Sequence, residues 1–157
     1  MICMLTGMEV SNASHYDGAT AAAEGVLMWR GDPRRTKVLV ASQIQPGVRT
    51  VLGTYLSGVP FEIVTAPEAD GVMDVAAATK LLDTTFLAVY VEQPNFSGRL
   101  EDLAALAAAV HRFGAKLVVG CYPISLGLLK NPASQGADVA VGEGQPLGLP
   151  AAFGGPY

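Results

Sequence analysis

The sequence predicts an α/β fold with a mostly parallel sheet covered by helices on both faces. Short apolar runs rich in β-branched residues alternate along the chain with segments whose apolar residues recur at helical spacing, which is the pattern of successive βαβ units. The 157 residues suit one domain, and half of them are apolar, so the chain can bury a substantial core. Because the sequence shows no repeat and no linker, we expect residues 1–157 to form one domain.

The first strong element is a helix that follows Asp17 and runs to about Arg30. Ser14 and Asp17 have the spacing of a capping box, and the Ala-rich stretch after them keeps apolar residues on one face. Gly18 and Ala19 would let a ligand or another backbone approach, and the unpaired N–H groups of a first helical turn attract anions. The segment is also typical of an ordinary capped helix packed on a sheet, and both interpretations stay open.

The remaining elements alternate along the chain after an apolar start at residues 1–8 that resembles the end of an element. We expect strands at 38–41, 61–65, 86–91, 117–119 and 139–141, and helices at 46–58, 74–82 and 100–113, with one further helical turn around 126–130. The 86–91 run is the longest and is expected at the centre of the sheet, whereas 61–65 alternates and is expected near an edge. The last two strands are both expected to be buried.

Composition argues against several classes of function. The net charge of −4 and the absence of a Lys/Arg stripe argue against a nucleic-acid partner. No apolar run reaches the roughly 18 residues of a membrane span, and we see no signal peptide and no C-x-x-C pair, so we expect a cytoplasmic protein. The spacing of Cys3, Cys121, His15 and His111 gives no support for a zinc site, and we expect no metal.

Candidate site residues lie near the ends of predicted strands. Glu143 and Gln145 stand between glycines after the 139–141 strand, where the backbone can adopt unusual angles and be closely approached. Glu92 ends the central strand, at the edge where open α/β sheets bind ligands. Each also has a plain structural interpretation: a rigid connecting loop for the first two, and a carboxylate that accepts backbone N–H groups for Glu92. Asp138 is expected to serve a turn. The sequence has no nucleotide-binding glycine motif and no G-x-S-x-G elbow.

Three stretches, taken in order, resemble one family. The stretches are TGMEVSNASHYDGATAAAE at 6–24, QPNFSGRLEDL at 93–103, and YPISLGLLK at 122–130 followed by GEGQPLG at 142–148 and FGGPY at 153–157. They resemble the P-protein family of the glycine cleavage system, glycine dehydrogenase (decarboxylating), in its subunit 1 form, over essentially the whole chain. The resemblance matches the interior of that subunit, so we expect the domain to be incomplete at both ends.

The resemblance implies the aspartate-aminotransferase-like fold of pyridoxal-phosphate enzymes, fold type I. It also implies a complex of two related subunits that decarboxylates glycine on pyridoxal phosphate and passes the aminomethyl group to the lipoyl arm of H-protein. In that fold the Schiff-base lysine belongs in the region matching 139–155, which contains none. The four lysines are Lys37, Lys80, Lys116 and Lys130. An Asp for the ring nitrogen belongs near the end of the 117–119 strand, where residues 120–123 read Gly-Cys-Tyr-Pro.

The resemblance therefore implies that the companion subunit 2 carries the lysine and the cofactor. We expect this chain to be the subunit that lacks the Schiff-base lysine, in an oxidoreductase that is active only as a heteromer. The residues expected to form an active-site wall at the interface are Asn12, Ser14, Asp17, Gly18, Glu143 and Gln145. Two alternatives stay open: an assembly subunit that contributes no residue to the catalytic pocket, and a self-sufficient enzyme that uses another lysine. Uncovered strand edges and apolar surface would make the chain depend on a partner for solubility.

Overall fold

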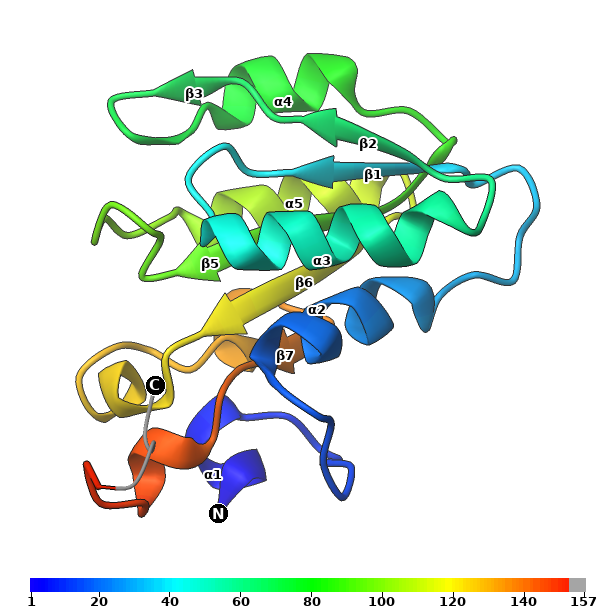
Figure 1. The fold of residues 1–157 in the computed structure, drawn as a ribbon. Helices are drawn as coiled ribbons and strands as arrows, with labels where there is room; N and C mark the ends of the chain where they lie inside the picture. The colour runs from blue at the N-terminus through cyan, green and yellow to red at the C-terminus, as the bar shows by residue number, and fades with distance from the viewer. Residues whose placement is uncertain (153–157) are drawn as a thin grey trace.

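The computed structural model describes residues 1–152 and contains a five-stranded sheet in the order β2-β1-β5-β6-β7 (Figure 1). The strands are β1 (Lys37–Val40), β2 (Glu62–Thr65), β5 (Phe86–Gln93), β6 (Lys116–Cys121) and β7 (Val139–Val141). Every neighbouring pair in this sheet is parallel, which confirms the predicted α/β fold. As predicted, β5 is the central strand and β2 lies at an edge.

Helices cover both faces of this sheet. They are α2 (Gly18–Leu27), α3 (Pro46–Ser57), α4 (Val75–Leu81) and α5 (Leu103–Arg112), with a short α1 (Ile2–Thr6) before them. Figure 1 shows α2 and α3 side by side on one face, with α5 behind the sheet. Short 3₁₀ turns lie at Pro123–Gly127, Ala133–Gln135 and Gln145–Leu147. Within residues 1–152, no helix combines the length and the apolar character that crossing a membrane requires.

Three predicted details are wrong. The helix α2 ends at Leu27 rather than near residue 30, because the chain continues as a turn in which the Arg30 N–H donates to the Leu27 carbonyl. The helix α5 begins at Leu103 rather than at residue 100, because Asp102 caps it by accepting the Ala105 N–H at 3.0 Å. The strand β7 is only half-buried, because it is the last strand on its side of the sheet.

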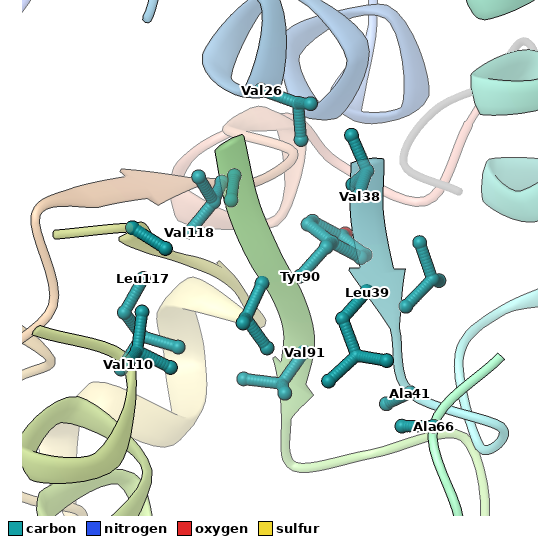
Figure 2. Close-up of a cluster of buried hydrophobic side chains, with 14 of the residues drawn as sticks. Val26, Val38, Leu39, Ala41, Ala66, Tyr90, Val91, Val110, Leu117 and Val118 are labelled. Carbon is teal, nitrogen blue, oxygen red and sulfur yellow. The ribbon is translucent and has the colours of Figure 1, made fainter. Parts of the chain in front are cut away.

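The core fills two layers, one on each side of the sheet. Figure 2 shows Val118 of β6 beside Val26 of α2, and Leu117 beside Val110 of α5. Neighbouring side chains of a strand point to opposite faces, so these two consecutive residues serve the two layers. All four side chains are 0% exposed, and burying each contributes about 1.5–3 kcal/mol. The core therefore holds the strand ends in fixed positions.

The strand order changes direction between β1 and β5. From β1 the chain moves outward to β2, then returns past β1 to β5 and continues through β6 to β7. In open parallel sheets, ligands bind outside the carboxyl ends of the strands at such a switch point. The carboxyl ends of β1, β5 and their neighbours therefore mark the expected position of a site.

Candidate functional site

A cleft of about 480 Å³ lies at the carboxyl ends of β5, β6 and β7. The starts of α2 and α3 also line it, so the cleft occupies the position that the strand order predicts. The residues contributed by the ends of the three strands include Tyr90, Glu92, Gly120, Cys121, Gly142 and Glu143. The cleft is thus built from segments that are far apart in the sequence and that the parallel sheet brings together.

The start of α2 is fixed by a capping box at Asp17. The Thr20 N–H donates to Asp17 Oδ1 at 2.7 Å, and the Asp17 N–H donates to Thr20 Oγ1 at 3.1 Å. The predicted box between Ser14 and Asp17 is therefore wrong. Because the first helical residue is Gly18, the cap position falls on Asp17, and Ser14 lies exposed before the helix.

Two glycines let α2 and β6 approach the end of β7. A Cβ built on Gly18 would lie 3.4 Å from Glu143 N and 3.5 Å from the Gly142 carbonyl carbon, so the helix start touches this backbone directly. A Cβ on Gly142 would collide with the carbonyl oxygen of Cys121 at the end of β6. These contacts bring Asp17 and Glu143 into the lining of one cleft.

Glu92 is held by two hydrogen bonds within the cleft. Its Oε2 accepts the Gln45 N–H at 2.8 Å, and its Oε1 accepts the Tyr90 hydroxyl at 3.2 Å. Burial raises the pKa of Glu92, and these hydrogen bonds and the charge of Arg49 offset that rise only in part. The structural interpretation of Glu92 is confirmed, because it accepts the backbone N–H next to α3, and its position in the cleft lining leaves the ligand interpretation open.

Tyr90 and Cys121 are cleft residues that stay uncharged near neutral pH. Burial, together with the charge of Glu92 beside it, raises the pKa of Tyr90 well above its usual range. Burial also raises the pKa of the Cys121 thiol to about 11, so this cysteine is a poor nucleophile. Gly120 leaves room for the Tyr90 side chain, because a Cβ at position 120 would collide with the Tyr90 hydroxyl.

The charged side chains that line the cleft are all acidic. They belong to Asp17, Glu92 and Glu143. Within the described residues, none of the four lysines lines the cleft. Lys116 instead pairs with Asp138, its Nζ lying 3.0 Å from Oδ1, and stands 4.7 Å from the centre of the Trp29 ring. The described lining of the cleft therefore carries negative charge and no basic side chain.

The six predicted site residues fall into two groups. Asp17, Gly18 and Glu143 line the cleft, and the Gln145 N–H donates to Glu143 Oε1 at 3.2 Å. Asn12 and Ser14 are exposed in the segment before α2 and are not among the described residues that line the cleft. The FGGPY segment at 153–157, which contributes to the resemblance, lies outside the described residues.

Asp138 has a larger role than the expected turn. It accepts hydrogen bonds from His111 Nε2 at 2.7 Å, Lys116 Nζ at 3.0 Å and the Leu117 N–H at 2.8 Å. Burial alone would raise the pKa of Asp138, but these hydrogen bonds outweigh it and hold that pKa below its ordinary value. Across residues 1–152, no group of three or more His, Cys, Asp or Glu side chains is placed to bind a metal ion.

Sequence reasoning missed Tyr90, Gln45 and Gly120 as cleft residues. Tyr90 and Glu92 are two apart in a strand, so their side chains share a face, and this spacing could have paired them. Gly120 lies opposite Glu92 in the register of β5 and β6. Its role, like that of the Gln45 N–H, appears only when the neighbouring strands are known.

Solved structures confirm the predicted fold type I. A cystathione gamma lyase from Micromonospora echinospora is 22% identical, with a TM-score of 0.61 over 80% of this chain and 32% of its own. An O-acetylhomoserine (thiol)-lyase from Campylobacter jejuni is 17% identical, with a TM-score of 0.67 over 81% of this chain and 30% of its own. The latter structure contains a pyridoxyl-lysine monophosphate, so the fold is one that pyridoxal-phosphate enzymes use.

Proteins with higher sequence identity to this chain show which family it belongs to. The "Probable glycine dehydrogenase (decarboxylating) subunit 1" of Thermomicrobium roseum is 52% identical over 161 residues, which cover 99% of this chain and 35% of that protein. A solved glycine decarboxylase (P-protein) of the glycine cleavage system, in inhibitor-bound form, is 46% identical with a TM-score of 0.90, over 100% of this chain and 35% of its own. The chain thus spans about a third of the length of these relatives. A family model described as "Glycine cleavage system P-protein" matches residues 1–157, and the chain therefore belongs to this family.

Proposed function

We propose that this chain is part of the subunit that lacks the Schiff-base lysine in a heteromeric glycine decarboxylase, the P-protein of the glycine cleavage system. The complex decarboxylates glycine with pyridoxal phosphate and passes the aminomethyl group to the lipoyl arm of H-protein. The cofactor supplies the electron sink for this chemistry. The observation that carries the proposal is that no lysine among residues 1–152 lines the cleft at the strand ends, in a chain that belongs to the P-protein family.

The residues of the cleft do not fit a cofactor anchored by this chain alone. A Schiff base with the cofactor needs a lysine amine, and within residues 1–152 no lysine lines the cleft. The cofactor phosphate would also meet the carboxylates of Asp17, Glu92 and Glu143. We therefore assign the lysine and the cofactor to the companion subunit 2.

The role proposed for this chain is to complete the wall of the active site across the subunit interface. Asp17, Gly18 and Glu143 contribute through the cleft, and Gln145 supports the Glu143 carboxylate with its N–H group. Asn12 and Ser14 belong to the exposed segment before α2, where they would meet the companion subunit rather than the cleft. We also place the complex in the cytoplasm, where the free thiols Cys3 and Cys121 stay reduced.

Reconstitution tests this proposal. The companion subunit, loaded with pyridoxal phosphate, is mixed with H-protein in the presence and in the absence of the complete subunit that contains this chain. Exchange of the glycine carboxyl carbon with labelled bicarbonate is then measured. We expect exchange only in the complete mixture. The double variant Asn12→Ala, Ser14→Ala should slow this exchange, and unchanged exchange would remove these two residues from the wall.

Other results would favour the alternatives. If the companion subunit exchanges the carboxyl carbon equally well without this subunit, the wall role is wrong and the subunit serves only assembly. If the isolated subunit binds pyridoxal phosphate with an imine absorbance band that borohydride abolishes, it is self-sufficient, and the assignment of the Schiff-base lysine to the companion subunit is wrong.

A further inference from the structure

Three buried polar residues in the described part of the chain form one cluster at the end of β5. Gln93, Asn95 and Glu101 are 6%, 4% and 4% exposed, and we call them the buried polar cluster. The Glu101 N–H donates to Gln93 Oε1 at 2.7 Å, and the Asn95 amide donates to Glu101 Oε1 at 2.9 Å. Neighbouring side chains of a strand point to opposite faces, so Gln93 lies on the other side of the sheet from Glu92 and the cleft.

Glu101 joins two loops through its two carboxylate oxygens. Oε1 accepts the amide of Asn95, which belongs to the loop after β5, and Oε2 accepts the Met73 N–H at 2.9 Å, at the end of β4 (Val72–Met73). The Asn95 amide also donates to the Gly71 carbonyl, just before β4, at 2.8 Å. The ion pairs of the described residues do not include Glu101, so N–H donors rather than a cation hold its carboxylate. Both oxygens are therefore needed as acceptors.

A path of hydrogen bonds and short chain segments leads from this cluster to the cleft. Asn95 is followed by Phe96, whose N–H donates to the Gln43 carbonyl at 2.9 Å. Gln43 lies in the loop after β1, and two residues later the same loop supplies the Gln45 N–H that donates to Glu92 Oε2 at 2.8 Å. The path thus passes from one face of the sheet, around the end of β5, to a carboxylate in the cleft lining.

We propose that Glu101 is a positioning residue for the cleft, which holds the loop after β5 and, through the loop after β1, keeps the Gln45 N–H on Glu92. Glu101 is not among the described residues that line the cleft, so it acts through these contacts. A buried polar network whose members are all satisfied fixes one geometry, and its bonds support one another. The inference does not rest on the proposed function, because it concerns contacts within this chain.

Hydrogen exchange of the complete subunit, measured by mass spectrometry, tests this coupling. Glu101→Gln keeps the shape of the side chain but sets an NH₂ group against the Asn95 amide or the Met73 N–H, so one bond is lost. Loss of a hydrogen bond to a charged group shifts an opening equilibrium at least about tenfold. We expect exchange to rise by about that factor in the peptides that cover Gln45 and Phe96, neither of which contacts the substituted atoms.

Asp102→Asn is the matched control for this substitution. It removes the same charge one residue away and still caps α5, because Asn caps a helix about as well as Asp. Exchange in the Gln45 and Phe96 peptides should stay within about twofold of the wild type, as for an exposed surface change. If Glu101→Gln does not fold, Glu101→Asp, which keeps the charge and shortens the side chain, serves in the same comparison.

The titration of Glu92 is a second readout, which a purely structural role of Glu101 would not change. The Gln45 N–H lowers the pKa of Glu92, against the larger rise that burial causes. If Glu101→Gln releases this N–H, the pKa of Glu92 rises further from its ordinary value. The carboxyl carbon signal of isotopically labelled glutamate reports this titration by nuclear magnetic resonance, and the variant Glu92→Gln assigns the signal.

The possible outcomes separate the proposal from its alternatives. If Glu101→Gln speeds exchange around Met73 but leaves the Gln45 peptide and the titration of Glu92 unchanged, Glu101 serves only the hairpin and the proposal is wrong. If exchange rises equally in all peptides, including that of the buried 86–91 run, the substitution only destabilises the whole fold, and the proposal is also wrong. Neither readout uses glycine or pyridoxal phosphate, so a reconstituted complex without carboxyl exchange would overturn the proposed function and leave the role of Glu101 standing.

Discussion

The capping box at the start of α2 allows a quantitative prediction for Asp17→Ala. The substitution removes the acceptor of the Thr20 N–H, which lies 2.7 Å from Asp17 Oδ1. Loss of an Asp N-cap typically costs about 1 kcal/mol, and loss of a negative charge at the positive end of a helix adds about 0.3–1 kcal/mol. We expect the free energy of unfolding to fall by about 1–2 kcal/mol. In a domain of this size, each kcal/mol lowers the Tm by about 2–4 °C.

Urea denaturation of the complete subunit, followed by circular dichroism, measures this loss. Asp17→Asn should recover most of the stability, because Asn caps a helix about as well as Asp and only the charge is lost. Ser14→Ala is the matched control and should change the free energy of unfolding by less than about 0.5 kcal/mol, because Ser14 is exposed and lies outside the box. If Ser14→Ala costs as much as Asp17→Ala, the helix begins earlier and the reasoning is refuted.

Three further predictions concern the cleft and its support. Gly120→Ala places a methyl group against the Tyr90 hydroxyl and should destabilise the subunit by about 1–3 kcal/mol in the same assay; no change would show that the Tyr90 side chain can move aside without cost. Glu101→Ala leaves the buried Met73 N–H without its acceptor at 2.9 Å and should cost at least about 1–3 kcal/mol by urea denaturation. Because burial raises the pKa of Glu92 above its ordinary 4.5, the stabilisation it gives is complete at low pH and is lost as pH rises through the folded value. Glu92→Gln should therefore gain stability relative to the wild type as the pH increases, and parallel pH profiles would contradict this.

Strands were easier to predict from the sequence than the residues that begin and end helices. A strand covered on both faces needs a nearly continuous apolar run, and the 86–91 run of β5 is such a signal. The helix α2 follows Asp17 as predicted, but its capping box was assigned wrongly because Ser14 and Asp17 are both good caps, and the partner that decides between them is the hydroxyl of Thr20 rather than a carboxylate. The β3 (Glu68–Ala69) and β4 (Val72–Met73) hairpin was missed, although Asp70 and Gly71 at its tip, with φ of 51° and 74°, form a known turn signal.

The cleft could be predicted only where its residues follow local rules. Asp17 and Glu143 were found because one caps a helix and the other follows a strand between glycines. The hydrogen bond from Gln45 to Glu92 was not predicted, because these residues are 47 positions apart and meet only when β1 and β5 are neighbours. Strand order is a property of the whole sheet, so no local pattern encodes that contact.

The magnitudes of two opposing effects decide which charge the cleft accepts. The start of α2 favours an anion by about 0.3–1 kcal/mol, and by about 2 kcal/mol where the site is partly buried. A carboxylate about 4 Å from a bound anion opposes it by about 4 kcal/mol at the effective dielectric constant near a protein surface. Three carboxylates line this cleft, and one of them, Asp17, already occupies the helix start as its cap. The repulsion therefore outweighs the helix dipole, and the same carboxylates favour a cation.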